Sequence, residues 1–408
     1  MNTTPKQQER PKKILYILPQ PFLTPRGSSF RALATVKAIT ALGIEVDLLT
    51  YPIGKNVSIE RLNLIRWWCF PKFEAIKIGP SFKKFLMDIP LFFKSAQLVL
   101  TNKYDLIHGP EEAGIMAAFF GKLLGIPYIY DMHSWMSQQI EEAKFIKSKT
   151  ILKLFKKLEI SCMHGARAII TVGPVMTEIL KQLAPNVPAF TLKDCSLDIA
   201  QEVDSNLRTK LVQDFKLNDK VVFLYTGNFE IYQGIDLLLE AFAELRRTEA
   251  DRFKNFTLLL VGGGAGQEDN IRKYKALVNK LELQDSVVFA GEWAVETMPT
   301  FMDIASVLVS PRTQGNNVPL KVYTYMASGK ISVVTDINSH TQVLNPQNSI
   351  VAPAEPKQFA QALAHAASTD PSVQAELNTL CNAAKTASET RADQIEFRQV
   401  VKDCYSLL

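Results

Sequence analysis

The chain has 408 residues, 47% of them hydrophobic and 21% charged, and a formal net charge of +5. This length accommodates two domains with a core each, and this composition excludes an intrinsically disordered chain. The positive charge is too small and too dispersed to indicate a nucleic-acid-binding protein, so no nucleic acid is expected as a partner.

Cysteine usage and the apolar segments indicate the cellular compartment. The five cysteines are scattered, without a Cys-x-x-Cys pair or metal-ligand spacing to histidine, which favours free thiols in a reducing compartment. Segment 1–13 is polar and does not resemble a signal peptide, and no apolar run reaches the length of a membrane span. We therefore expect a cytoplasmic protein, or one that associates peripherally with the inner face of the cell membrane.

The first half of the chain alternates between predicted strands and helices. A continuous apolar run predicts a buried strand over residues 13–18, and a loop rich in Pro, Gly and Ser follows over 19–29. Apolar residues at helical spacing from Phe30 to Leu42 predict a helix, which Gly43 ends. Further strands, expected at 46–50, 106–107, 128–130 and 168–171, complete the pattern of a doubly wound parallel sheet.

The pattern restarts after a polar, charged segment over residues 196–220, which we interpret as a connector. Strands are predicted at 221–225, 257–261, 287–290, 307–310 and 331–335, each followed by a loop or helix. The final helix carries one apolar stripe, made of Phe397, Val400, Val401, Cys404 and Leu408. The predicted domains are residues 1–195, with the C-terminal helix at about 391–408 packed back on it, and residues 196–390.

The expected fold class is therefore α/β, with two doubly wound Rossmann-like domains that face each other across a cleft. In open α/β sheets, ligands bind beyond the carboxyl ends of the strands. The loops that follow the strands are the candidate binding and catalytic segments.

Two loops of the first domain carry candidate residues for binding or catalysis. Gly27, just before a helix, allows the backbone to approach a ligand closely, although a plain capped turn explains the same residues. Tyr130-Asp-Met-His133 follows a strand, where His133 could donate to a sugar hydroxyl and Asp131 could orient it. A purely structural histidine is the alternative.

A third loop of this domain, Ile107-His-Gly-Pro-Glu-Glu112, also ends a strand. His108, Glu111 and Glu112 would bring a histidine and two carboxylates to the acceptor side of the cleft. These groups suit acceptor hydroxyls or a cationic acceptor group. Solvated loop charge is the competing interpretation.

The second domain has a compact turn and a basic loop that suit a phosphate group. Gly227 and Gly234 flank polar residues between a strand and a helix. A later strand ends at Ser310, and a glycine- and asparagine-rich loop leads to a helix that begins near Pro319. Arg312, Lys321 and the helix amides would form an anion site of the kind that a departing diphosphate requires. A solvated basic helix start is the alternative.

A glycine-rich segment, Leu260-Val-Gly-Gly-Gly-Ala-Gly-Gln267, superficially suggests dinucleotide binding. However, Gln267 stands where the third glycine of the Gly-x-Gly-x-x-Gly pattern belongs, and no acidic residue ends the next strand. The sequence therefore argues against a nicotinamide-dependent oxidoreductase.

The combination of these segments, in this order over nearly the whole chain, resembles glycosyltransferase family four, whose members have the GT-B fold. The segments that carry the resemblance are Arg26-Gly27-Ser28, Tyr130-Asp-Met-His133, Tyr225-Thr-Gly227, Gly234-Ile-Asp236, Pro319-Leu-Lys321 and Tyr325-Met-Ala-Ser-Gly329. The resemblance implies a retaining, metal-independent transferase without a cofactor, whose nucleotide-diphosphate sugar is held mainly by the second domain.

The same resemblance implies roles for individual residues. His133 would contact the transferred sugar, and the Gly27 loop would approach the diphosphate. The loop Gly291-Glu-Trp293, with Glu292 and Trp293, would hold the base.

The chain departs from the family pattern at four positions. The family usually has two glutamates separated by seven residues, and Asn316 and Thr324 occupy these places. The basic pair that usually follows the first strand of the donor domain is replaced by Asn228 and Gln233. Phosphate charge would then fall on Arg312 and Lys321, which indicates a divergent subfamily.

Residues 61–94 interleave cations with large apolar side chains, as in Arg66-Trp-Trp-Cys-Phe70 and Phe82-Lys-Lys-Phe85. This pattern suits a peripheral patch on an anionic bilayer, and core helices with basic outer faces are the alternative. The predicted function is transfer of a sugar from a nucleotide-diphosphate donor to a glycan, lipid-linked or other acceptor, in synthesis of a surface polysaccharide or glycoconjugate. A sugar-nucleotide epimerase and an inactive nucleotide-sugar-binding homologue are the alternatives.

Overall fold

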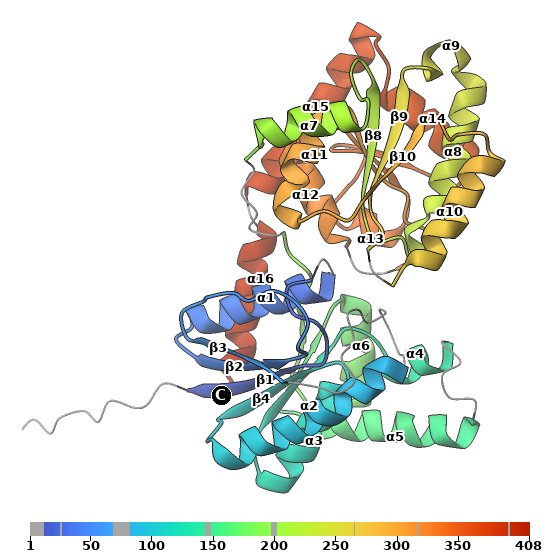
Figure 1. Ribbon diagram of the computed structural model, residues 1–408. Coiled ribbons are helices and arrows are strands. Elements are labelled where there is room, and N and C mark those ends of the chain that lie inside the picture. Colours follow the sequence, from blue (N-terminus) through green and yellow to red (C-terminus); the bar gives the residue numbers. More distant parts are fainter. Residues whose placement is uncertain are drawn as a thin grey trace, which may run out of the picture. The chain divides into compact units, whose positions relative to one another are not determined.

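The computed structural model describes residues 12–24, 27–67, 82–142, 148–196, 202–264, 266–315, 318–390 and 392–408. The chain divides into two compact units. Unit 1 comprises Met1–Lys193 together with Ile395–Leu408, and unit 2 comprises Asp194–Gln394. Each unit is an α/β sheet with helices on its faces (Figure 1).

Unit 1 is built on a seven-stranded parallel sheet in the order β3-β2-β1-β4-β5-β6-β7. The strands are β1 (Lys13–Leu18), β2 (Glu45–Thr50), β3 (Leu62–Arg66), β4 (Leu106–Pro110), β5 (Tyr128–Met132), β6 (Ala168–Thr171) and β7 (Ala189–Thr191). The helices are α1 (Gly27–Ala41), α2 (Phe82–Thr101), α3 (Ala113–Leu124), α4 (Met136–Glu142), α5 (Lys149–Gly165) and α6 (Pro174–Leu183). The C-terminal helix α16 (Ala392–Tyr405) enters this unit from Ile395.

The two faces of the unit 1 sheet pack against different helices. Alternate strand residues such as Leu15, Ile17 and Ile107 join a core with α2, α3 and α5. The α1 and α16 helices lie across the opposite face (Figure 1), where Phe397, Val401 and Cys404 of the predicted apolar stripe are buried. Val400 and Leu408, the other members of the stripe, are half-buried.

Unit 2 repeats this architecture with a six-stranded parallel sheet in the order β10-β9-β8-β11-β12-β13. The strands are β8 (Val221–Gly227), β9 (Phe256–Gly262), β10 (Val287–Gly291), β11 (Val307–Ser310), β12 (Ser332–Thr335) and β13 (Ile350–Ala352). The helices are α7 (Ser205–Asp214), α8 (Ile235–Thr248), α9 (Ala250–Phe253), α10 (Glu268–Lys280), α11 (Met298–Ile304), α12 (Leu320–Ser328), α13 (Asn338–Thr341), α14 (Pro356–Ala366) and α15 (Pro371–Glu389), with single 3₁₀ turns η1 (Ile231–Gln233) and η2 (Val295–Thr297).

Both sheets have the strand order of a doubly wound dinucleotide-binding domain, in which the direction of winding reverses between two central strands. These strands are β1 and β4 in unit 1, and β8 and β11 in unit 2. The loops at their carboxyl ends splay apart and leave room for a ligand. The fold therefore directs attention to the loops after β1 and β4 and after β8 and β11.

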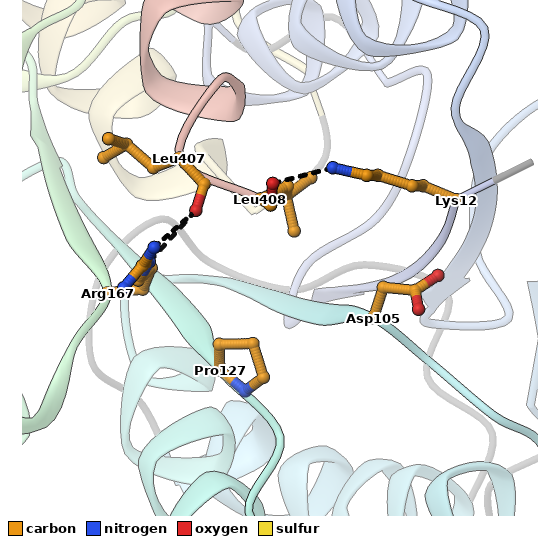
Figure 2. Close-up of a pocket in the computed structure, with 6 residues that line it drawn as sticks. All are labelled: Lys12, Asp105, Pro127, Arg167, Leu407 and Leu408. Carbon is orange, nitrogen blue, oxygen red and sulfur yellow. Dashed lines mark hydrogen bonds between the residues drawn. The ribbon is translucent and has the colours of Figure 1, made fainter.

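The opposite, amino-terminal edge of the unit 1 sheet has a pocket lined by Lys12, Asp105, Pro127, Arg167, Leu407 and Leu408 (Figure 2). Arg167 donates to the main-chain oxygen of Leu407 from Nε and Nη2, at 3.0 and 2.9 Å. Lys12 Nζ donates to that of Leu408 at 2.7 Å. The cations in this pocket thus fix the segment that follows α16 and hold α16 against the sheet.

Candidate active site

A buried carboxylate, Asp131, organises the carboxyl edge of the unit 1 sheet. It lies near the end of β5 and is fully buried. Arg31 Nη2 approaches its Oδ1 at 3.5 Å, and His108 Nε2 and His133 Nε2 each lie 3.3 Å from its Oδ2. Arg31 also donates to the main-chain oxygen of Leu192 at 2.8 Å. The predicted His133, Asp131 and His108 are therefore brought together, from two strands and the loop that follows β5.

The charges of this group depend on one another. Burial opposes ionisation of Asp131, but the charges of His133 and Arg31 hold its pKa well below its ordinary value. Burial likewise opposes protonation of His133, but the Asp131 carboxylate raises its pKa above the ordinary value. Burial lowers the pKa of His108, against a weaker opposite effect of Asp131. The group therefore holds an ionised aspartate, a neutral His108 and a His133 disposed to carry a proton.

The two predicted glutamates follow β4 and differ in their contacts. Glu111 has a left-handed backbone with φ of 51°, and its carboxylate accepts from Ser134 Oγ at 3.3 Å and lies 3.6 Å from His133 Nδ1. Burial raises its pKa above the ordinary value, although the His133 charge opposes the shift. Glu112 instead forms an ion pair with Lys84 of α2. Glu111 thus belongs to the His133 group, and Glu112 lies beside it.

The second group of candidate residues lies at the carboxyl edge of the unit 2 sheet. Lys321, on the first turn of α12, extends its amine towards the loop that follows β8. Its Nζ donates to Gln233 Oε1 at 3.2 Å and lies 3.8 Å from the centre of the Tyr225 ring. Burial, and then the charge of Arg312, hold the pKa of Lys321 well below its ordinary value.

Arg312 occupies the loop that follows β11, the second of the two strands between which the winding of the unit 2 sheet reverses. Its guanidinium lies 5.2 Å from the centre of the Tyr232 ring, and its Nε donates to the main-chain oxygen of Gln314 at 2.6 Å. Burial lowers its pKa from the ordinary value. Two half-buried cations therefore flank the point where the winding of the unit 2 sheet reverses.

The backbone of these two loops is closely fitted. Gly234 has a φ of 70°, and a Cβ on it would lie 2.0 Å from the main-chain oxygen of Pro311. A Cβ on Gly262 would lie 1.8 Å from the main-chain oxygen of Gly227. Only glycine permits these approaches. The loop after β8 is thereby fixed against the loops that follow β9 and β11.

Both carboxyl edges fall within family matches. Residues 25–189 match the family described as Glycosyltransferase Family 4, and residues 220–369 match the one described as Glycosyl transferases group 1. The chain belongs to glycosyltransferase family four.

A curated relative, alpha-D-kanosaminyltransferase from Streptomyces kanamyceticus, is 21% identical to this glycosyltransferase over 268 residues, 63% of this chain and 66% of that relative. The matches to two further relatives cover 51% and 50% of those proteins. The chain thus spans between about half and two thirds of these curated relatives' lengths.

Two solved structures show the fold. Sucrose-phosphate synthase from Thermosynechococcus elongatus matches with a TM-score of 0.72 at 18% identity, over 97% of this chain and 100% of that one. Alr3699/HepE from Anabaena, in complex with UDP and glucose, matches with a TM-score of 0.69 at 17% identity, over the same shares. The glycosyltransferase therefore has the GT-B fold.

The remaining predicted site residues lie on the same edges or nearby. Gly27 is exposed at the start of α1, Asn228 is half-buried directly after β8, and Thr324 is half-buried on α12. Glu292 is exposed after β10. The Trp293 indole donates to the main-chain oxygen of Ala290 at 2.9 Å and packs on Phe301. These contacts fix the orientation of the indole before any ligand binds. Arg26 and Asn316 lie outside the described residues.

Several residues of the two groups were not assigned by the sequence. Arg31 is one: the inward face of α1 also carries Ser29 and Thr35, so no local pattern marked Arg31 as a buried cation that meets a carboxylate. Tyr225 and Tyr232, which flank the unit 2 cations, carry no local signal either. Tyr405 contacts His108 from α16, nearly three hundred residues later in the chain.

Two absences can be stated for the glycosyltransferase within the ranges described. No three His, Cys, Asp or Glu side chains there cluster in a way that would hold a metal ion. No helix in those ranges has the length and apolar composition to cross a membrane.

Proposed function

We propose that this glycosyltransferase moves a glycosyl group from a nucleoside-diphosphate sugar to an acceptor hydroxyl with retention of configuration and without a metal ion. The bond between the anomeric carbon and the diphosphate oxygen breaks, and the acceptor oxygen bonds to that carbon on the same face. The acceptor proton passes to the departing diphosphate, so atoms and charge balance.

The observation that carries the proposal is the pair of half-buried cations at the point where the winding of the unit 2 sheet reverses. The chain has Asn228 and Gln233 in place of the family's usual basic pair in the loop after β8. Lys321 and Arg312 come from another part of the chain and lie against this loop, at Gln233 and Tyr232 respectively. A leaving diphosphate gains negative charge in the transition state, and preorganised cations in a buried setting stabilise that charge. The presence of UDP in the HepE complex supports a uridine diphosphate donor.

On unit 1, we assign His133 to the transferred sugar and Glu111 to the acceptor side. A protonated His133 can donate to a sugar hydroxyl, and its side chain is 14% exposed, whereas its Nε2 is buried and faces Asp131. Its contact with Asp131 is an ion pair rather than an aligned hydrogen bond. His108 is fully buried, so in this proposal it acts through Asp131 and does not touch the acceptor, and Glu112 is engaged by Lys84.

The test of the proposal combines binding and turnover. We expect UDP and UDP-sugars to raise the melting temperature of the chain in a panel of nucleoside diphosphates and their sugar conjugates, because a ligand that binds the folded state stabilises it. Glycoside formation with acceptor present should follow, and Arg312→Ala and Lys321→Ala should abolish it. Lys280→Ala, which changes an exposed lysine on α10, is the matched control.

Two outcomes would contradict the proposal. Epimerised free sugar nucleotide in the absence of acceptor would instead indicate an epimerase. If no nucleotide in the panel raised the melting temperature, the chain would have no site for a nucleotide donor.

We also propose that unit 1 contacts an anionic bilayer through the outer face of α2, which suits a lipid-linked acceptor. The α2 helix has two apolar stripes. The inner one includes Met87, Leu91 and Leu98, which are buried in the core. The outer one is between 43% and 71% exposed and consists of Phe82, Phe85, Ile89, Phe93 and Leu100. Their spacing places all five on the side of the helix opposite to the core.

The outer stripe continues onto α3 through aromatic contacts. The Phe92 ring lies 5.8 Å from that of Phe93 and 5.5 Å from that of Phe119. Phe119 and Leu123 of α3 are 51% and 67% exposed. The exposed cations Lys83 and Lys122 flank this surface. Apolar side chains beside lysines suit the boundary between acyl chains and anionic headgroups. Residues 68–81 of the predicted patch lie outside the described residues.

Co-sedimentation with phosphatidylglycerol-containing vesicles tests this contact. We expect Phe85→Ser with Phe93→Ser to weaken binding by about tenfold or more, because two exposed aromatic side chains no longer enter the bilayer. The control is Val175→Ser with Ile395→Ser, which removes two side chains of similar exposure, 66% and 63%, elsewhere on the unit. Equal losses in both pairs, or concentration-dependent dimers that the Phe85 and Phe93 changes dissociate, would contradict the bilayer contact.

A further inference from the structure

The Asp131 group is joined to the C-terminal helix by a chain of three contacts that the proposed chemistry leaves unexplained. Tyr405 of α16 places its hydroxyl 2.7 Å from His108 Nδ1. His108 Nε2 lies 3.3 Å from Asp131 Oδ2, and the same oxygen lies 3.3 Å from His133 Nε2. Tyr405, His108 and Asp131 are all buried. A contact on α16 thus reaches His133 through two intermediate side chains.

The direction of each hydrogen bond in this chain is determined by its ends. An ionised aspartate can only accept, so His108 Nε2 must carry the proton that faces Asp131. Burial lowers the pKa of His108, which favours the neutral imidazole. Nδ1 of a neutral Nε2–H imidazole can only accept, so the Tyr405 hydroxyl must be the donor. Tyr405 therefore stabilises the one tautomer of His108 that supports Asp131.

The surroundings hold the His108 ring in this position. Tyr16 of β1 stacks on it with ring centres 4.3 Å apart and planes 11° from parallel. The Tyr405 ring is nearly coplanar with it, at 9°, and meets its edge through the hydroxyl. A 180° turn of the imidazole would keep the stacking, but it would put carbon in place of Nδ1 and Nε2 and so lose the contacts with Tyr405 and Asp131. Its Nε2–H is consequently directed at Asp131.

We infer that Tyr405 and His108 are positioning residues for His133, and that they act by holding the Asp131 carboxylate as a preorganised acceptor. The inference rests on the role proposed above for His133. Buried ion pairs contribute little to stability in general, whereas a catalytic side chain needs closely held support. The C-terminal helix thus supplies part of the support for the unit 1 site. Neither Tyr405 nor His108 touches the substrate in this scheme.

The first test is independent of activity. The chain has five histidines, and nitrogen-15 spectra of the labelled side chains distinguish the two neutral tautomers and the imidazolium. Because burial lowers the pKa of His108, we expect it to be the neutral Nε2–H tautomer at neutral pH. An imidazolium or an Nδ1–H tautomer in the unmodified chain would overturn the inference.

The second test removes only the Tyr405 hydroxyl. In Tyr405→Phe, we expect the His108 and His133 resonances to shift and kcat to fall by about 3- to 10-fold with the donor KM unchanged. The control is Tyr104→Phe, which deletes a buried hydroxyl that donates to Asp47 in the same unit. If the two variants behaved alike, Tyr405 would be a packing residue only.

The third test asks whether a single N–H donor near the position of His108 Nε2 is enough to support Asp131. His108→Gln can place an amide N–H near the position of Nε2, whereas His108→Phe keeps a ring without a donor. We expect the glutamine variant to recover most of the kcat and of the His133 resonance position that the phenylalanine variant loses. Equal losses would overturn the inference. If the unmodified chain showed no transfer at all, the proposed function would fail, and the His133 resonances would still decide whether His108 and Tyr405 position that side chain.

Discussion

The two sheets have the same strand order, but the charged side chains at their carboxyl edges are partnered differently. In unit 1, the buried carboxylate of Asp131 is surrounded by Arg31, His108 and His133, so charge is balanced within the protein. In unit 2, Lys321 contacts a neutral amide and a tyrosine ring, and Arg312 adds a second positive charge nearby. Among the residues described, no carboxylate forms an ion pair with Lys321.

This difference indicates the ligand that each edge suits. A balanced group such as the one around Asp131 can donate and accept hydrogen bonds without demanding a charged partner, which suits sugar hydroxyls. Among the residues described, Lys321 has no carboxylate as an ion-pair partner, and a cation in that setting is stabilised by an anion such as a diphosphate. The two units therefore divide the proposed reaction, with sugar contacts on unit 1 and leaving-group charge on unit 2.

The largest expected effect is on stability, and it has opposite signs at the two edges. Arg31→Met leaves Asp131 without one of its cations, and we expect it to lower the free energy of unfolding by about 3–5 kcal/mol. Lys321→Met removes a half-buried charge from near Arg312, so stability should be unchanged or higher. Scanning calorimetry, with the transitions compared between variants, measures both. A loss in the Lys321 variant as large as that for Arg31 would mean that unit 2 is balanced too.

A smaller effect concerns the loop that places the unit 2 cations. Gly234→Ala would bring a methyl group against the main-chain oxygen of Pro311, whereas Gly43→Ala, at a similar φ of 82°, meets nothing within 4 Å. We expect the Gly234 variant to lose about 1–3 kcal/mol more stability than the Gly43 variant. Urea unfolding compares them. Similar losses in the two variants would show that the loop after β8 moves to accommodate the methyl group and therefore does not hold Lys321 in place.

The smallest expected effect is a pH dependence confined to unit 2. Burial and the Arg312 charge lower the pKa of Lys321 in the free chain, and a bound diphosphate would raise it again. Binding should therefore take up as much as one proton, and affinity should fall as pH rises through the window between the two values, by at most about tenfold per unit. Calorimetric titrations in buffers of different ionisation enthalpy measure the uptake. Lys321→Arg should remove it, and uptake that persists in this variant would contradict the assignment.

The central strands were predictable because each is a continuous buried apolar run bounded by turn residues. Strands β3, β7 and β13 were not predicted, and all three lie at sheet edges. Two of them have only three residues, and most of their side chains are half-buried. An edge strand packs on fewer neighbours, so it needs no long apolar run, and its sequence resembles that of a loop.

The candidate site was predictable where residues that act together are also close together in the sequence. His133 with Asp131, and Arg312 with Lys321, stand at strand ends or helix starts, where fold rules place ligands. The sequence did not indicate that Asp131 is fully enclosed or that His108 faces Tyr405 rather than solvent, because these contacts join segments far apart in the chain. Such pairings depend on tertiary packing, which no local pattern encodes.

The most direct test of the divided charge compares two variants in one titration. UDP is titrated into Lys321→Ala and into His133→Ala, and turnover is measured with a UDP-sugar and an acceptor. We expect Lys321→Ala to weaken UDP binding by about 10- to 100-fold, and His133→Ala to bind UDP normally while kcat falls by about 10²-fold or more. If His133→Ala lost UDP binding as severely as Lys321→Ala, or if Lys321→Ala bound UDP normally, the assignment of the leaving group to unit 2 would be wrong.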